Sequence, residues 1–141
     1  MQTTHATYLL LVEADTLCAT HIKRALTELG VAERLIHVRS AEAALAYLAT
    51  KPADQGLLAL VDMDTPDKSG CHLVSVMKSD ETWRSIPIIV MTASGKSLDV
   101  LESFNYSIAG YLVKPHDHTR MLETVRVVAD YWALSQMPAC A

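Results

Sequence analysis

The sequence predicts an α/β domain, a (βα)5 three-layer sandwich in which helices cover both faces of a central five-stranded parallel sheet. Two observations predict this class. Five short apolar runs alternate along the chain with longer segments whose apolar residues recur at helical spacing. The runs are continuously apolar, which is typical of strands that are buried on both faces of a parallel sheet.

Each apolar run has the length of a strand, and each is followed by polar residues or a turn. The expected strands are Tyr8–Val12, Leu35–Val38, Leu57–Val61, Ile86–Met91 and Tyr111–Val113.

The segments that follow the strands carry the start and stop signals of helices. Gly30 is a stop signal after the first helix, Ser40 is a plausible N-cap of the second, and Pro52 lies just beyond its end. In the last segment, apolar residues recur at spacings of three and four. The expected helices are Thr16–Leu29, Ala41–Ala49, Ser69–Lys78, Ser97–Phe104 and Asp117–Leu134.

Length and composition favour one globular domain over residues 1–141, with a short N-terminal tail (1–7) and a C-terminal extension (135–141). The net charge of −4 and the absence of a Lys/Arg run argue against nucleic acid as a partner. The sequence shows no signal-peptide pattern and no apolar run long enough to span a membrane. We therefore expect a cytoplasmic protein without a membrane partner.

Polar residues stand where the predicted strands end. Glu13 follows the first strand, Asp62 follows the third, Thr92 follows the fourth and Lys114 follows the fifth. Functional sites of such sheets lie at the carboxyl ends of the strands, so we expect these side chains to converge at one edge.

This set of residue types suits the formation of an acyl phosphate. A carboxylate can attack phosphorus if a divalent cation, a positive side chain and a hydroxyl balance the charge of the phosphoryl oxygens. We expect Asp62 to be the nucleophile and Glu13, Asp62 and Asp64 to hold Mg²⁺, which prefers oxygen ligands. Lys114 would supply the positive charge and Thr92 the hydroxyl.

Four ordered motifs carry a resemblance to a known family. The chain resembles the response-regulator receiver domains, the CheY-like group of two-component signalling systems. The resemblance implies a flavodoxin-like fold and a phosphoacceptor signalling domain that is no enzyme beyond self-catalysed phosphotransfer. The matching segments are LLLVEAD (9–15), LVDMDTPDKSG (60–70), IPIIVMTA (86–93) and GYLVKP (110–115).

The resemblance also implies a role for each matching residue. Asp62 takes a phosphoryl group from a sensor histidine kinase, and Lys114 pairs with the phosphorylated side chain. Thr92 is the switch hydroxyl, and Tyr111 is the aromatic residue that follows it inward. The bond between Lys114 and Pro115 is expected to be cis.

A narrower resemblance concerns MKSDETWRSIP (77–87) and DYWALSQMP (130–138), which are similar to the stand-alone regulators that serve phytochromes. It implies a phytochrome-type kinase as partner and a homodimer formed through the C-terminal helix. That helix is apolar on two sides, which is typical of an interface when the helix is peripheral. Val127, Tyr131 and Trp132 are the interface candidates.

The chain departs from the family at the metal site. Ala14 replaces an acidic metal ligand, and Asp64 replaces a common Asn. Two interpretations therefore stay open: a working receiver with a weaker Mg²⁺ site, or a degenerate receiver that signals by binding alone.

A third interpretation comes from another class. The run LLALVDMDTP (57–66) resembles the motif of haloacid-dehalogenase-like phosphatases, with Asp62 as nucleophile and Asp64 as general acid/base. The position of this motif on the third strand and the lack of a closing acidic motif argue against it. Turnover of a generic phosphomonoester would distinguish this class from a receiver.

Overall fold

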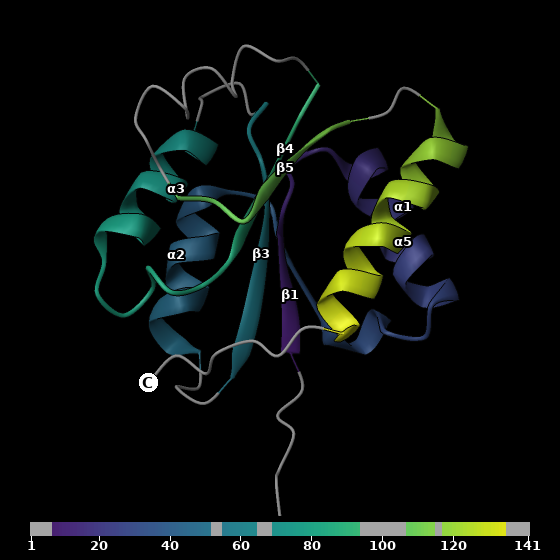
Figure 1. Cartoon of the computed structure of the whole chain (residues 1–141). Helices are drawn as coiled ribbons and strands as arrows, with labels where there is room; N and C mark the ends of the chain where they lie inside the picture. Colours follow the sequence, from purple (N-terminus) through teal and green to yellow (C-terminus); the bar gives the residue numbers. More distant parts are fainter. Residues whose placement is uncertain (1–6, 52–54, 65–68, 94–106, 115–116, 135–141) are drawn as a thin grey trace, which may run out of the picture.

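A single parallel sheet forms the middle of the molecule (Figure 1). The computed structural model describes residues 7–51, 55–64, 69–93, 107–114 and 117–134, apart from the side chains of 118 and 131–134. Its strands are β1 (Thr7–Val12), β2 (Leu35–Val38), β3 (Gly56–Asp62), β4 (Ile88–Thr92) and β5 (Gly110–Val113).

The strand order is β2-β1-β3-β4-β5, and all four pairings are parallel. This is the flavodoxin-like order, in which the connection reverses direction between β1 and β3. The register places Val12 beside Val61, Asp62 beside Met91 and Thr92 beside Val113. The carboxyl ends of the strands are therefore level with one another, and the predicted fold is confirmed.

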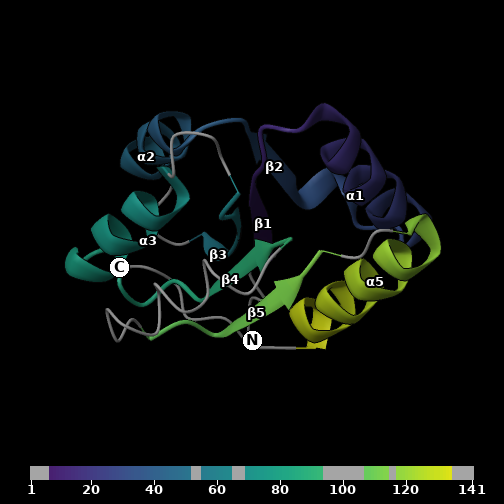
Figure 2. The same cartoon turned by 90° about the horizontal axis from the view of Figure 1, so that it is seen from above.

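Helices cover both faces of the sheet (Figures 1 and 2). Helices α2 (Ala41–Thr50) and α3 (Ser69–Ser79) lie on one face, and α1 (Thr16–Glu28) and α5 (His118–Leu134) lie on the other. A short 3-10 helix, η1 (Ala32–Arg34), precedes β2. Each face has its own apolar core, one containing Leu10 and Leu73 and the other Leu11 and Ile22. This arrangement is a three-layer sandwich.

The local signals for helix ends are confirmed where they were predicted. The Ser40 side chain accepts a hydrogen bond from the Ala43 N–H at the start of α2. Gly30 has φ of +76° just after α1, a backbone conformation that glycine adopts without steric cost. The predicted helix Ser97–Phe104, most of the N-terminal tail and the C-terminal extension lie outside the described residues.

Two details of the sequence-based expectation are wrong. The fourth strand begins at Ile88 instead of Ile86, because Pro87 has no N–H to donate to the ladder. The edge strands β2 and β5 are only partly buried, whereas β1, β3 and β4 are almost fully buried. A continuous apolar run thus indicates a strand without telling whether it lies at the centre or the edge. None of the described helices is long and apolar enough to cross a membrane.

Candidate functional site

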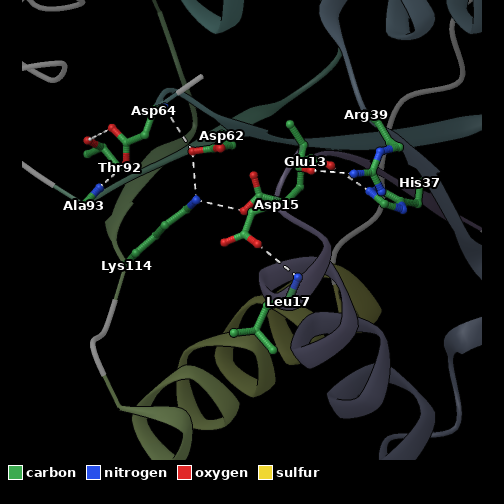
Figure 3. A network of polar contacts seen from close by, with 11 residues as sticks. Glu13, Asp15, Leu17, His37, Arg39, Asp62, Asp64, Thr92, Ala93 and Lys114 are labelled. Atoms are coloured by element: carbon green, nitrogen blue, oxygen red, sulfur yellow. Dashed lines mark hydrogen bonds and ion pairs between the residues drawn. The ribbon is translucent and has the colours of Figure 1, made fainter. Parts of the chain in front are cut away.

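The polar residues singled out in the sequence meet at the carboxyl edge of the sheet (Figure 3). Glu13 directly follows β1, Asp62 ends β3, Thr92 ends β4 and Lys114 directly follows β5. In the strand order β2-β1-β3-β4-β5, the connections lead to one side up to β2 and to the other side from β3 onward. The site lies at this switch point between β1 and β3, where sites of parallel sheets are expected.

The first half of the site is a buried ion-pair group, which we call the Lys114 cluster: Glu13, Asp62 and Lys114. The ammonium Nζ of Lys114 lies 2.8 Å from Oε1 of Glu13 and 2.9 Å from Oδ1 of Asp62. The side chain of Glu13 is fully buried, that of Asp62 is 6% exposed and that of Lys114 is 15% exposed. One ammonium therefore serves two carboxylates in a region of little water.

This crowding changes the proton affinity of all three groups. Burial, together with the proximity of Asp62, raises the pKa of Glu13 to about 7. Burial alone would also raise the pKa of Asp62, but hydrogen bonds with Glu13, the Asp64 amide and Lys114 hold it below its usual value. Burial disfavours the Lys114 ammonium, yet its bonds to the two carboxylates outweigh this and raise its pKa. At neutral pH Asp62 and Lys114 are thus ionised, whereas Glu13 is near the midpoint of its titration.

Two residues hold the loop that follows β1: His37, within β2, and Arg39, directly after β2. A ring nitrogen of His37 lies 2.8 Å from the carbonyl oxygen of Glu13. The guanidinium of Arg39 donates to the carbonyl of Ala14 at 2.8 Å and to Oγ1 of Thr16 at 3.0 Å. Sequence reasoning missed His37 and Arg39, although their place at the end of the strand next to β1 is a signal that could have found them.

The second half of the site, which we call the Asp64 cluster, consists of Asp64, Thr92 and Ala93. Oγ1 of Thr92 donates to Oδ1 of Asp64 at 2.9 Å, and the Ala93 N–H donates to Oδ2 of Asp64. Thr92 is fully buried and Asp64 is exposed. Figure 3 shows the Asp64 carboxylate turned toward the end of β4 instead of toward Glu13.

The predicted metal ligands are consequently divided between the two clusters. Within the described ranges, no group of three or more His, Cys, Asp or Glu side chains is placed to hold a metal ion. Oε2 of Glu13 is buried without a hydrogen-bond partner, and the Ala14 carbonyl is taken by Arg39. The residues present fit a divalent cation with two protein carboxylates, Glu13 and Asp62.

Gly70, at the start of α3, is packed directly against the main chain of Asp62. A Cβ atom at this position would lie 2.5 Å from the carbonyl oxygen of Asp62 and 3.2 Å from Cα of Met63. No real Cβ contact is that short, so the absence of a side chain allows α3 to approach the end of β3. Gly70 was part of a matching motif, but no role had been predicted for it.

The remaining predicted residues lie away from the two clusters or outside the described part of the chain. The side chain of Tyr111 is 51% exposed on edge strand β5, so it does not lie inward here. Val127 on α5 is 67% exposed. Pro115 and the side chains of Tyr131 and Trp132 lie outside the described residues.

Comparisons with known proteins agree on one family. Residues 9–126 match the response regulator receiver domain. The probable methanogenesis regulatory protein FilR2 of Methanothrix harundinacea is 32% identical over 127 residues, which cover 88% of this chain and 82% of FilR2.

Two further response regulators are similar in sequence and structure. The crystal structure of the phosphorylated cyanobacterial phytochrome response regulator RcpA is 26% identical, covers 95% of this chain and 99% of RcpA, and has a TM-score of 0.82. Response regulator Rcp1 of Synechocystis sp. is 25% identical over 88% of this chain and 87% of its own. The Mn²⁺-bound form of a response regulator Rcp1 has a TM-score of 0.79 at 24% identity, covering 94% of this chain and 99% of the other.

The family match spans both clusters up to the middle of α5, and the structural likeness extends over nearly the whole chain. The protein therefore belongs to the response regulator receiver domains, the CheY-like signalling domains of two-component systems.

Proposed function

We propose that this receiver accepts a phosphoryl group from a sensor histidine kinase on the side chain of Asp62. The observation that carries the proposal is the Lys114 cluster: a carboxylate that is nearly buried at the end of a central strand, with its charge held by an ammonium 2.9 Å away. The phosphorylated form of RcpA, a relative at 26% identity, supports it.

The contacts of Asp62 indicate which atom reacts. Oδ1 accepts hydrogen bonds from Lys114 and from the Asp64 N–H at 3.0 Å, so Oδ2 is the attacking oxygen. Its bond to phosphorus forms as the bond from phosphorus to the kinase histidine nitrogen breaks, and the imidazole leaves. The lowered pKa keeps Asp62 ionised at neutral pH, and Lys114 balances the charge that the phosphoryl group brings.

We further propose that Glu13 and Asp62 hold Mg²⁺, with Asp64 outside the ligand set because its carboxylate is bonded to Thr92 and Ala93. The ion supplies electrostatic screening between the carboxylates and the incoming phosphoryl oxygens. The existence of a Mn²⁺-bound form of Rcp1 supports the binding of a divalent cation. With Ala14 in place of an acidic ligand, the affinity for Mg²⁺ is lower than three carboxylates would give.

The partner and the readout are proposed on two separate grounds. The phytochrome response regulator RcpA supports a phytochrome-type kinase as the phosphodonor. The exposed Val127 supports homodimerisation through α5, with Tyr131 and Trp132 as further candidates. Sedimentation velocity at several concentrations, with Val127→Asp as the disrupting variant, tests the dimer.

The intact mass after incubation with acetyl phosphate and Mg²⁺ tests the central proposal. One added phosphoryl group in the natural chain and none in Asp62→Asn is the expected result. No added group at any Mg²⁺ concentration would favour the degenerate receiver, which the loss of a ligand at Ala14 makes the second candidate. Continuous release of inorganic phosphate from a generic phosphomonoester would instead support the phosphatase interpretation, which the family match over residues 9–126 disfavours.

A further inference from the structure

We propose that Asp64 is a positioning residue that occupies, within the protein itself, the donors that a phosphoryl group on Asp62 would use. Its carboxylate holds the Thr92 hydroxyl and the Ala93 N–H before any phosphate arrives. The effect on phosphoryl uptake rests on the function proposed above, whereas the occupation itself does not.

The geometry of the Asp64 cluster carries the first step. The two carboxylate oxygens take one donor each, so both are used at once. Both donors belong to the end of β4, and the hydroxyl of Thr92 is fully buried. The Asp64 N–H donates to Oδ1 of Asp62 at 3.0 Å, which fixes the main chain of Asp64 directly beside the phosphoacceptor. Asp64 is therefore bonded to Asp62 through its main chain and to Thr92 through its side chain.

The chemistry of the side chain carries the second step. A carboxylate offers two acceptor oxygens, whereas the carboxamide of Asn offers one oxygen and an NH₂ group that donates. Asn could not accept from Thr92 and Ala93 with both of its terminal atoms. The arrangement with two donors therefore requires a carboxylate at position 64. A receiver that carries Asn at this position, as the family commonly does, cannot form it.

The consequence is competition at the site. A phosphoryl group needs hydrogen-bond donors for the oxygens that Lys114 does not contact, and a hydroxyl and an amide beside the acceptor suit them. Asp64 takes both donors and also places a like charge near the incoming dianion. Phosphoryl uptake must therefore displace the Asp64 carboxylate from Thr92 and Ala93.

The first measurement reads the occupation directly and needs no phosphate. Amide ¹H–¹⁵N spectra are recorded for the full chain, free of metal and phosphate, in the natural form, in Asp64→Ala and in Asp80→Ala, because alanine has no acceptor atom. Asp80 is a matched control, because its carboxylate also accepts from two main-chain N–H groups, those of Thr82 and Trp83, away from the site. The expected result is that the Ala93 resonance moves upfield in Asp64→Ala and stays in place in Asp80→Ala. An unmoved Ala93 resonance in Asp64→Ala overturns the proposal.

The second measurement reads the competition. The oxygen of Asp62 displaces acetate from acetyl phosphate, and intact mass follows the rate at saturating Mg²⁺. Asp64→Asn is expected to react about tenfold faster than the natural chain, because the loss of roughly one charge-assisted hydrogen bond changes a rate by about this factor. The control Asp80→Asn is expected to react at the rate of the natural chain. An unchanged or slower rate in Asp64→Asn overturns the competition. If no form is labelled, the proposed phosphoacceptor function fails, and the Ala93 resonance still decides whether Asp64 occupies the donors.

Discussion

The Lys114 cluster and the Asp64 cluster lie on the same edge of the sheet but differ in their contact with water. In the first, Glu13 and Asp62 are buried with the one ammonium between them. In the second, an exposed carboxylate accepts from a buried hydroxyl and an amide. Charges in a poorly solvated place interact strongly and are costly when unpaired, whereas water screens those at the rim. Breaking the first cluster should therefore lower the free energy of unfolding more than breaking the second.

The comparison also clarifies the departure at Ala14. An acidic residue at this partly buried position would add a third carboxylate beside a cluster that holds a single ammonium. Ala14 instead contributes only its carbonyl, which Arg39 binds from the end of β2. The charge within the Lys114 cluster is therefore closer to balance, at the expense of one ligand for a divalent cation.

Removal of the shared ammonium should give the largest effect. Lys114→Met leaves the charge of the buried Asp62 uncompensated and forces a proton onto the neighbouring Glu13, so we expect the free energy of unfolding to fall by about 3 kcal/mol at pH 7.5. Urea denaturation in EDTA measures it. Lys23→Met, at an exposed position of α1, is the control and should change stability by less than about 0.5 kcal/mol.

A second variant separates charge from packing in this experiment. Adding Glu13→Gln to Lys114→Met removes the acid that must take up a proton once the ammonium is lost, so it should restore part of the lost stability. If the double variant is no more stable than Lys114→Met alone, the cost of burying Glu13 beside Asp62 is not the cause of the loss.

The close packing at Gly70 should give the next effect. Gly70→Ala forces a methyl group against the carbonyl oxygen of Asp62, so we expect a loss of about 2 kcal/mol in the free energy of unfolding, as for other overpacked sites. Gly110→Ala is the matched control, because nothing lies within 4 Å of a Cβ there. Equal losses in the two variants would show that backbone entropy or strand propensity, and not the contact with Asp62, is responsible.

The raised pKa of Glu13 predicts a pH dependence of stability. Between pH 4.5 and about 7, folded chains keep a proton on Glu13 that unfolded chains have released. The free energy of unfolding should therefore decrease as the pH rises through this window, by on the order of 1 to 2 kcal/mol, and the Glu13 contribution should level off above it. The lowered pKa of Asp62 acts in the opposite direction, but only below its ordinary value of 3.8.

Urea denaturation in EDTA at pH 5 and at pH 7.5 measures this difference. Glu13→Gln should lose it, because the amide does not titrate, while Glu81→Gln, at an exposed carboxylate, should keep it. A difference of the same size in Glu13→Gln would assign the pH dependence to another group.

The sequence predicted the residues of the Lys114 cluster because their positions follow from topology. Each ends or follows a strand, and parallel strands bring their carboxyl ends to one edge. No rule of spacing tells in which direction an exposed side chain turns, so the division of Asp64 from Glu13 was not predicted. The outcome depends on which donors compete for Asp64, and those come from β4, a strand distant in sequence.

The edges of the sheet were mispredicted for a related reason. Leu35–Val38, apart from His37, and Tyr111–Val113 are apolar like the central runs, yet both strands lie at the sheet edges and are partly exposed. Apolar character indicates that a segment forms a strand, whereas the strands and helices packed around it determine how much of its surface is buried. Arg39 escaped notice likewise, because its role depends on β2 lying next to β1.

The Asp64 cluster should show the smallest effect on stability. In a double-mutant cycle of Asp64→Ala and Thr92→Val, we expect a coupling energy of about 1 kcal/mol, the value of one hydrogen bond at a partly solvated site. The cycle cancels the other interactions of Thr92, so it isolates this contact. Asp64→Ala combined with Lys23→Met is the control pair and should be additive. A coupling of 3 kcal/mol or more would place Asp64 in the same energetic class as the Lys114 cluster, and the distinction between a buried and a screened half of the site would then be wrong.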